Sequence, residues 1–151
     1  LDSRGFKPAD FARSHPGGAL GRKLLTHVRD IMRRDLHVPA VKPTTKGLEL
    51  MQDMGDKGLG ATAITDANGI PIGIFTDGDL RRLIAQGGDL RVAVAQDIMR
   101  PNPRTINQQA LAAEAADLME THAVTSLLVV DDTGRLVGAI NSNDLMRAKV
   151  I

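Results

Sequence analysis

The chain has 151 residues, 42% hydrophobic and 25% charged, so it has enough apolar side chains to build a globular core. Its net charge is only +1, no run of five Lys or Arg residues occurs, and only 2% of residues are aromatic, so we expect no nucleic-acid partner. The absence of cysteine excludes disulfides, thiolate metal sites and thiol nucleophiles, and it is compatible with the cytoplasmic location that we expect.

The N-terminal segment, residues 1–27, carries no apolar core of the kind found in signal peptides. No stretch of the chain approaches the roughly 18 consecutive apolar residues of a membrane span, so we expect no membrane contact. The chain begins at Leu1 rather than Met, within a loop-like sequence. We therefore expect a piece of a longer protein, in which residues 1–27 are the partly disordered end of a preceding domain.

An internal repeat organises the rest of the chain. Residues 28–32 (VRDIM) recur as residues 95–99 (AQDIM), and residues 73–80 (GIFTDGDL) recur as residues 138–145 (GAINSNDL), at offsets of 67 and 65 residues. Two landmarks in the same order at nearly the same shift indicate a duplicated unit. We place unit 1 at residues 28–90 and unit 2 at residues 91–151.

Each unit repeats the same order of predicted elements. Hydrophobic periodicity and turn sequences define them in unit 1: an extended stretch at 37–41, an amphipathic helix around 48–54 with a C-cap at 57–60, strands at 61–65 and 70–75 joined by a turn at 66–69, and a helix at 80–85. The matching elements of unit 2 lie at 103–106, 111–119, 126–130, 135–140 and 145–148. The fold class is therefore α/β, with two β-α-β-β-α units. A single unit would bury only a marginal core, so the two should pack together with pseudo-twofold symmetry.

The duplicated unit and the sequence GIFTDGD at residues 73–79 resemble a tandem pair of CBS domains, of the cystathionine-β-synthase type. The resemblance runs from about residue 28 to the end of the chain. It implies a compact disc, a homodimer of pairs, and clefts between the units that bind adenosyl compounds or other nucleotides. It also implies a regulatory role that needs no cofactor.

The N-terminal flank resembles a narrower family. Residues 11–25 (FARSHPGGALGRKLL) are similar to the segment that joins the sugar-isomerase (SIS) domain to the CBS pair in arabinose-5-phosphate isomerases. Those enzymes interconvert D-ribulose 5-phosphate and D-arabinose 5-phosphate, on the way to Kdo and lipopolysaccharide. The resemblance implies an own SIS domain and a tetrameric full enzyme, with the rest of the SIS domain outside this sequence.

The best candidates for ligand contact are Thr76 and Asp79, at a predicted helix start. A hydroxyl there can donate to a phosphate oxygen, and free backbone N–H groups favour the anion. A carboxylate three residues on can accept from ribose hydroxyls, and the CBS resemblance implies these two roles. The alternative interpretation is a helix cap completed by a capping box, which the spacing fits equally well.

The second copy departs from this pattern, because Asn141 stands at the Thr76 position while Asp144 is kept. We therefore expect the two clefts to differ, and one of them to bind weakly or to be empty. Arg81 and Arg82 follow the first motif, and a guanidinium is the natural bidentate partner of a phosphate or carboxylate. The alternative interpretation is that Arg81 and Arg82 lie on a solvent-exposed face of the helix and contact no ligand.

Three further residues, Thr62, Thr125 and Ser126, stand at the starts of central strands. In CBS domains such positions contact the base or ribose, and the alternative is ordinary strand-edge hydrogen bonding. His15 of the HPGG sequence is, by the isomerase resemblance, a catalytic group of the full enzyme, suited to proton transfer because its pKa lies near neutrality. Without the other active-site groups we expect this sequence alone to be inactive.

No metal site is expected, because the remaining histidines have no ligand spacing and cysteine is absent. We therefore predict a regulatory CBS pair that senses a nucleotide-type ligand. CMP-Kdo, the end product downstream of arabinose 5-phosphate, is the first candidate, and AMP or ATP is the alternative. A different class of function is a ligand-free oligomerisation module.

Overall fold

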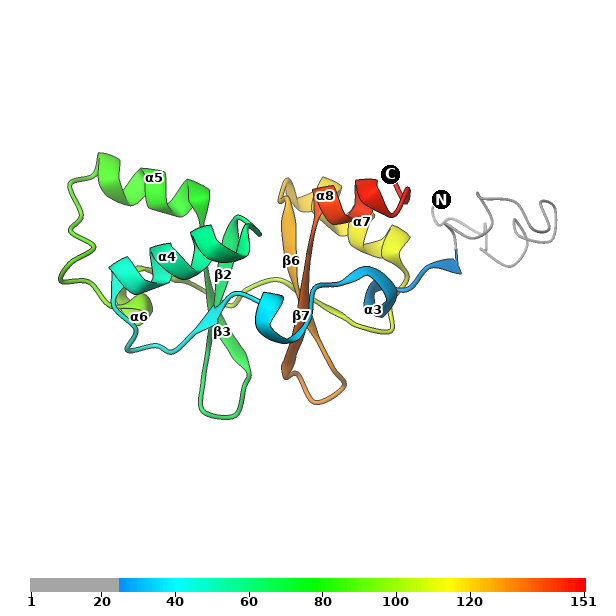
Figure 1. The fold of residues 1–151 in the computed structure, drawn as a ribbon, viewed down its shortest axis with the longest axis horizontal. Coiled ribbons are helices and arrows are strands. Elements are labelled where there is room, and N and C mark those ends of the chain that lie inside the picture. The colour runs from blue at the N-terminus through cyan, green and yellow to red at the C-terminus, as the bar shows by residue number, and fades with distance from the viewer. Residues whose placement is uncertain (1–24) are drawn as a thin grey trace.

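The computed structural model describes residues 25–151 (Figure 1). Two similar units stand side by side, and in each a β-hairpin extends away from the helices, which lie along one side of the molecule (Figure 1). The predicted α/β class and the duplicated unit are confirmed. No helix within residues 25–151 is long and apolar enough to cross a membrane.

Unit 1 contains the first half of the elements, and both its hairpin and its longer helices occur where the sequence predicts them. They are α3 (Val28–Ile31), a 3-10 turn (Asp35–His37), β1 (Ala40–Val41), α4 (Gly47–Lys57), β2 (Ala61–Thr65), β3 (Pro71–Thr76) and α5 (Asp77–Ala85). The extended stretch predicted at 37–41 is shortened to β1. The reason is that the N–H of His37 turns back to the carbonyl of Arg34, at 3.1 Å.

Unit 2 repeats this order, with a short strand in place of the 3-10 turn. Its elements are α6 (Ala95–Ile98), β4 (Arg100–Pro101), β5 (Thr105–Asn107), α7 (Ala112–His122), β6 (Ser126–Val130), β7 (Leu136–Asn141) and α8 (Ser142–Arg147). The sequence analysis predicts neither α3 nor α6 nor β4. Each is only two to four residues long, too short for a period to be recognised in the sequence.

The strands form two sheets, in the orders β1-β2-β3-β4 and β5-β6-β7. In each sheet the first strand is parallel to the second, and the second and third form the antiparallel hairpin. The hairpins also match in register, because Ala61 pairs with Thr76 and Ser126 pairs with Asn141. The last strand of each hairpin therefore runs directly into a helix start at the same end of both units.

The two units exchange their first helices. Val28 of α3 is fully buried in the core of unit 2, with Leu127 and Ile140, and its N–H donates to the carbonyl of Ala110 at 2.8 Å. In the same way α6 is buried in the core of unit 1, where Ala95 packs in the cluster that contains Phe75. Each half of the sequence, residues 28–90 or 91–151, therefore gives its first helix to the core of the other half. We call each core, with the sheet and helices packed around it, a body.

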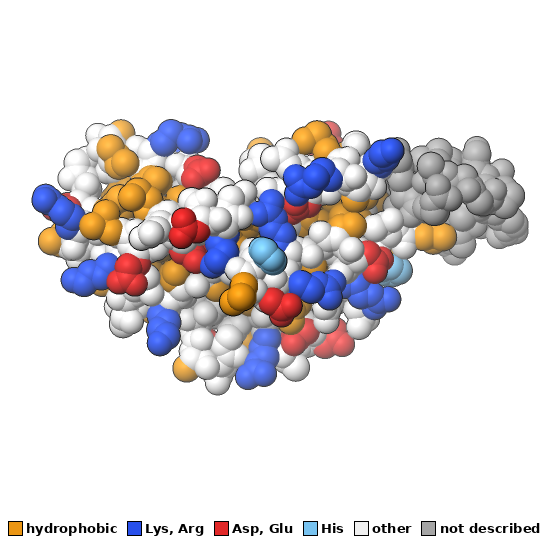
Figure 2. Space-filling model, viewed as in Figure 1, with side chains coloured by type: hydrophobic (Ala, Val, Ile, Leu, Met, Phe, Trp, Pro, Cys, Tyr) orange, Lys and Arg blue, Asp and Glu red, His pale blue; other side chains and the backbone are white. Residues whose placement is uncertain are grey.

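Small residues line the contact between the two bodies. Ala61 of β2 and Ala139 of β7 are fully buried in one cluster with Leu59, and Val38 and Ile74 pack around it. Alanine at these positions allows the two sheets to approach closely. The approach brings the helix starts of α5 and α8 near the junction, where the space-filling view shows a notch between the two bodies (Figure 2).

Candidate ligand-binding clefts

Both strand-to-helix junctions carry the same reciprocal cap. The hydroxyl of Thr76 accepts from the backbone N–H of Asp79 at 3.2 Å, and the Asp79 carboxylate accepts from the backbone N–H of Thr76 at 2.9 Å. Asn141 and Asp144 repeat the pair at 2.9 and 3.0 Å. The capping box, one of the two interpretations of the motif, is therefore present in both units.

The Asp79 carboxylate also holds two arginines. It is 8% exposed, and it accepts from Arg82 Nη2 at 2.5 Å and from Arg100 Nε at 3.2 Å. Burial raises the pKa of this carboxyl, but the hydrogen bonds from the Thr76 backbone and the Arg82 side chain outweigh it, so its pKa lies below the ordinary value. Asp79 is therefore ionised at neutral pH.

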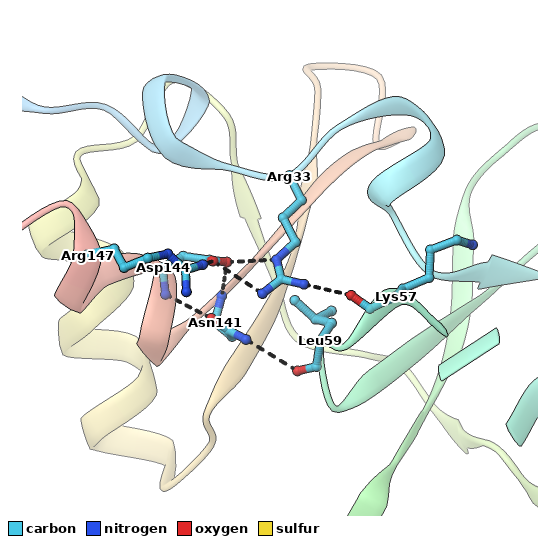
Figure 3. Close-up of polar contacts among 6 residues, drawn as sticks. All are labelled: Arg33, Lys57, Leu59, Asn141, Asp144 and Arg147. Carbon is cyan, nitrogen blue, oxygen red and sulfur yellow. Dashed lines mark hydrogen bonds and ion pairs between the residues drawn. The ribbon is translucent and has the colours of Figure 1, made fainter. Parts of the chain in front are cut away.

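Asp144 holds the equivalent pair of arginines in unit 2 (Figure 3). Arg33 donates from Nε at 3.1 Å and from Nη2 at 3.2 Å, and Arg147 Nη2 also donates to the carboxylate. Arg33 reaches further and donates from Nη1 to the carbonyl of Lys57 at 2.9 Å. Arg33 thus connects α8 with the end of α4, across the junction between the two bodies (Figure 3).

Cleft 1 opens on the Thr76 side of the junction. Its volume is about 660 Å³, and it is lined by the start of α5, by residues 100–104 and by residues 122–126. Thr76, Arg81 and Arg82 therefore face residues delivered by the second half of the chain. A cleft of this volume lies within the range typical of small-molecule sites.

Cleft 2 opens on the Asn141 side and has a volume of about 410 Å³. It is lined by the start of α8, by the turn from α4 into β2, and by Asp77 and Thr125. Gly58 ends α4 there in the left-handed conformation, with φ 66°, as the sequence predicts for this C-cap. The two clefts thus occupy related positions but have different linings.

The structure distributes the predicted site residues unevenly. Thr76, Arg81, Arg82, Thr125 and Ser126 all line cleft 1. Asn141 lines cleft 2. Five of the nine predicted ligand-binding residues are therefore brought together in one place, and whether they touch a ligand stays a prediction.

The other predicted residues lie behind the clefts or outside the part of the chain that the structure describes. Asp79 and Asp144 are buried beneath their caps and do not line either cleft. Thr62 is fully buried in β2, and among the described residues its hydroxyl has no hydrogen-bond partner. His15 lies outside the described residues. Within residues 25–151 no cluster of three His, Cys, Asp or Glu side chains is arranged to hold a metal ion.

Sequence reasoning missed the arginines that come from the exchanged segments. Arg100 and Arg104 line cleft 1, and Arg33 binds behind cleft 2. A signal was present, because the repeated motif continues for one residue beyond residues 32 and 99 and ends in arginine in both copies. Only the exchange of helices, however, shows that Arg100 reaches the Asp79 of the other half.

The sequence pattern of the CBS domain matches the chain twice, at residues 28–86 and 94–151. The chain belongs to the CBS domain family. The predicted tandem CBS pair is thereby confirmed, and the clefts described above lie at the junction of its two domains. The exchanged helices α3 and α6 fall at the beginning of the two matched segments.

The whole chain, including the residues before the CBS pair, is also similar to two curated isomerases. It is 45% identical over 151 residues to arabinose 5-phosphate isomerase KdsD of Pseudomonas aeruginosa, and 44% identical to KdsD of Escherichia coli K12. In both comparisons the alignment covers 100% of this chain and 46% of the isomerase. The chain thus spans about half the length of these relatives.

A solved CBS pair has the same fold at lower sequence identity. CBSX2, a protein of Arabidopsis thaliana, was crystallised in complex with AMP, and that structure matches with a TM-score of 0.72. The match covers 83% of this chain and 96% of the CBSX2 chain, at 24% identity. This likeness establishes the fold.

Proposed function

We propose that this CBS pair is the regulatory region of an arabinose-5-phosphate isomerase and that it binds a nucleotide-type ligand in cleft 1. The observation that carries the proposal is the convergence of Thr76 with four arginines on one cleft of about 660 Å³. Identity of 45% to the P. aeruginosa isomerase over the whole chain supports the parent enzyme. The AMP complex of CBSX2 supports the class of ligand.

The cap does not prevent Thr76 from binding a phosphate. Its hydroxyl oxygen accepts from the N–H of Asp79, which leaves the hydroxyl hydrogen free to donate into cleft 1. Asp79 has less capacity left. Its carboxylate has about four acceptor positions, and Thr76, Arg82 and Arg100 use three of them. Because Asp79 is 8% exposed and does not line cleft 1, its part in the proposal is to hold Arg82 and Arg100 at the cleft rather than to contact the ribose.

The parent enzyme would interconvert D-ribulose 5-phosphate and D-arabinose 5-phosphate in the cytoplasm, in a SIS domain that precedes residue 28. His15 belongs to that domain in the proposal and acts there as a proton-transfer group. Ligand in cleft 1 would change isomerase activity by binding two arrangements of the protein with different affinity. The CBS pair itself performs no chemistry.

CMP-Kdo is the first candidate ligand. Its phosphodiester suits Thr76, and the Kdo carboxylate suits an arginine of cleft 1. Feedback by this end product of Kdo activation, on the route to lipopolysaccharide, would limit arabinose 5-phosphate production. AMP and ATP are the alternative ligands.

Titration calorimetry of the chain with CMP-Kdo, AMP and ATP tests the proposal. We expect one of the three to bind and to raise the melting temperature in proportion to its saturation. Thr76→Val should weaken binding, whereas Thr76→Ser, which keeps the hydroxyl and the cap, should preserve it. Absence of heat and of any melting-temperature rise with all three ligands contradicts a sensor.

A second function, oligomerisation, is supported by exposed apolar side chains on the helices. Leu48 of α4, Ile84 of α5 and Met146 of α8 are 46%, 59% and 52% exposed, and apolar side chains gather over the α4–α5 region (Figure 2). A homodimer of CBS pairs, and a tetramer of the full enzyme, would cover them. Sedimentation with and without ligand distinguishes this role, because a purely structural module dimerises regardless of ligand.

A further inference from the structure

Cleft 1 carries an excess of positive charge. Four arginines line it, at positions 81, 82, 100 and 104, and Asp77 is the one acidic residue in its lining. The buried Asp79 contributes a second negative charge through its contacts with Arg82 and Arg100. With His122 counted as neutral, four positive and two negative charges leave the cleft at +2.

The arginines of cleft 1 have free hydrogen-bond donors. Within residues 25–151, the side chains of Arg81 and Arg104 form no hydrogen bond and no ion pair. The side chains of Arg82 and Arg100 are 63% and 56% exposed, and each uses a single nitrogen on Asp79. A guanidinium has five N–H donors in a planar fork, so most of these donors remain available to an anion in the cleft.

Cleft 2 lacks this excess of positive charge. Asp77 is the one charged residue in its lining, and when the buried Asp144 is counted with Arg33 and Arg147, as Asp79 is for cleft 1, two negative and two positive charges leave cleft 2 neutral. Arg33, the counterpart of Arg100, is only 19% exposed, and three of its nitrogens are used on Asp144 and on the carbonyl of Lys57 (Figure 3). Two other cleft 1 arginines have no arginine counterpart in the repeat, because Met146 stands at the position of Arg81 and, by the strand register, Pro39 stands at that of Arg104.

We infer that each chain binds one ligand with two negative charges, in cleft 1, and that cleft 2 rejects it. The +2 cleft is neutralised by such a ligand, whereas cleft 2 has no net charge and no arginine in its lining to bind an anion. The selecting residues are Arg81, Arg82, Arg100 and Arg104. The inference rests on the proposed function for the nucleoside part of the ligand, but it depends on the arginines for the anionic part.

Arg82 and Arg147 provide a matched pair of variants. Each is an exposed arginine that donates to the capping aspartate three residues before it, in equivalent helices. Arg82→Gln and Arg147→Gln should therefore cost similar and small amounts of stability, because exposed ion pairs stabilise little. Only Arg82→Gln should weaken binding, by roughly tenfold or more, since it removes a charged hydrogen bond to the ligand. Arg104→Gln should act like Arg82→Gln, with no change in the melting temperature of the free protein.

Calorimetry with CMP-Kdo, AMP, the uncharged nucleosides cytidine and adenosine, and inorganic pyrophosphate tests the inference. We expect one site per chain, affinity that falls with salt, and nucleosides that bind at least tenfold more weakly than the nucleotide. Two equivalent sites per chain, equal weakening by Arg82→Gln and Arg147→Gln, or a nucleoside that binds as tightly as its nucleotide would overturn the inference while the nucleotide-sensing function stands. A third outcome is that pyrophosphate binds, that Arg82→Gln abolishes this binding, and that neither nucleotide binds. This outcome supports the anion site and refutes the nucleotide sensor. No binding of any probe refutes both.

Discussion

Cleft 1 and cleft 2 are built from equivalent parts of the repeated unit, yet the equivalent arginines Arg100 and Arg33 make different contacts in the two clefts. Arg100 is 56% exposed and presents its free donors to cleft 1, whereas Arg33 is 19% exposed and joins α8 to the end of α4. Both bind the capping aspartate of the other half. The duplicated scaffold therefore keeps the aspartate and its cap in both copies. The two copies differ in the residues around it, because one cleft is lined by four arginines and the other by none.

The largest difference between the copies should appear on removing the capping aspartates. Asp144→Ala leaves the mostly buried Arg33 without its partner, which we expect to cost about 3 kcal/mol of stability. Asp79→Ala should cost about 1–2 kcal/mol, because Arg82 and Arg100 are exposed enough to be hydrated instead. Urea unfolding at neutral pH measures both. Equal losses would contradict the assignment of Arg33 as a structural connection.

The next largest difference in stability should appear when two equivalent glycines, Gly73 and Gly138, are replaced by alanine. A Cβ on Gly138 would lie 2.7 Å from the backbone carbonyl oxygen of Arg33, whereas the three nearest atoms to a Cβ on Gly73 all belong to the Met99 side chain. We expect Gly138→Ala to cost about 2 kcal/mol and Gly73→Ala distinctly less, because a methionine side chain adapts and a backbone segment does not. Thermal unfolding of the two variants decides the order, and the reverse order would contradict it.

Exchanging glycine and alanine at the two helix C-caps beside the clefts should change the free energy of unfolding in opposite directions. Gly58 ends α4 with φ 66°, and Ala123 ends α7 with φ 53° at the equivalent position. Gly58→Ala should cost about 1 kcal/mol, and Ala123→Gly should gain somewhat less than about 1 kcal/mol, because a Cβ is strained in this conformation. Denaturant titrations measure both, and a destabilising Ala123→Gly would show that the cap geometry is not strained.

The smallest effect concerns acid pH and a single carboxyl group. The folded-state pKa of Asp79 lies below the unfolded value of about 3.9, so ionised Asp79 stabilises the fold above that pH. This stabilisation is lost as the pH falls through the folded-state pKa. The stability gap between the wild-type chain and Asp79→Asn should therefore be constant above about pH 5 and should shrink below about pH 4. A gap that is the same at pH 3 and pH 7 would contradict the lowered pKa.

Much of the fold and part of the site follow from local sequence patterns. The hairpins, the amphipathic helices and the C-cap at Gly58 depend on residues close in sequence, and they occur where predicted. Thr76, Arg81 and Arg82 were recognised as site candidates because a single helix start brings them together. Thr62 shows the limit of such reasoning, because its strand position is right while its burial depends on which sheet face the helices cover.

By itself, the sequence determined the duplication and the order of the longer elements in each unit, because these follow from the internal repeat and from local hydrophobic periods. It left the capping box at Thr76 and Asp79 as one of two interpretations. Only the tertiary structure decided that α3 and α6 change places, since this exchange arises from packing between residues at least 20 positions apart, such as Ala95 with Phe75 and Val28 with Leu127. The exchange delivers Arg100 to Asp79 and Arg33 to Asp144. The difference in burial between these two arginines, which leaves donors free in cleft 1 but not behind cleft 2, is set by long-range packing rather than by the residue type.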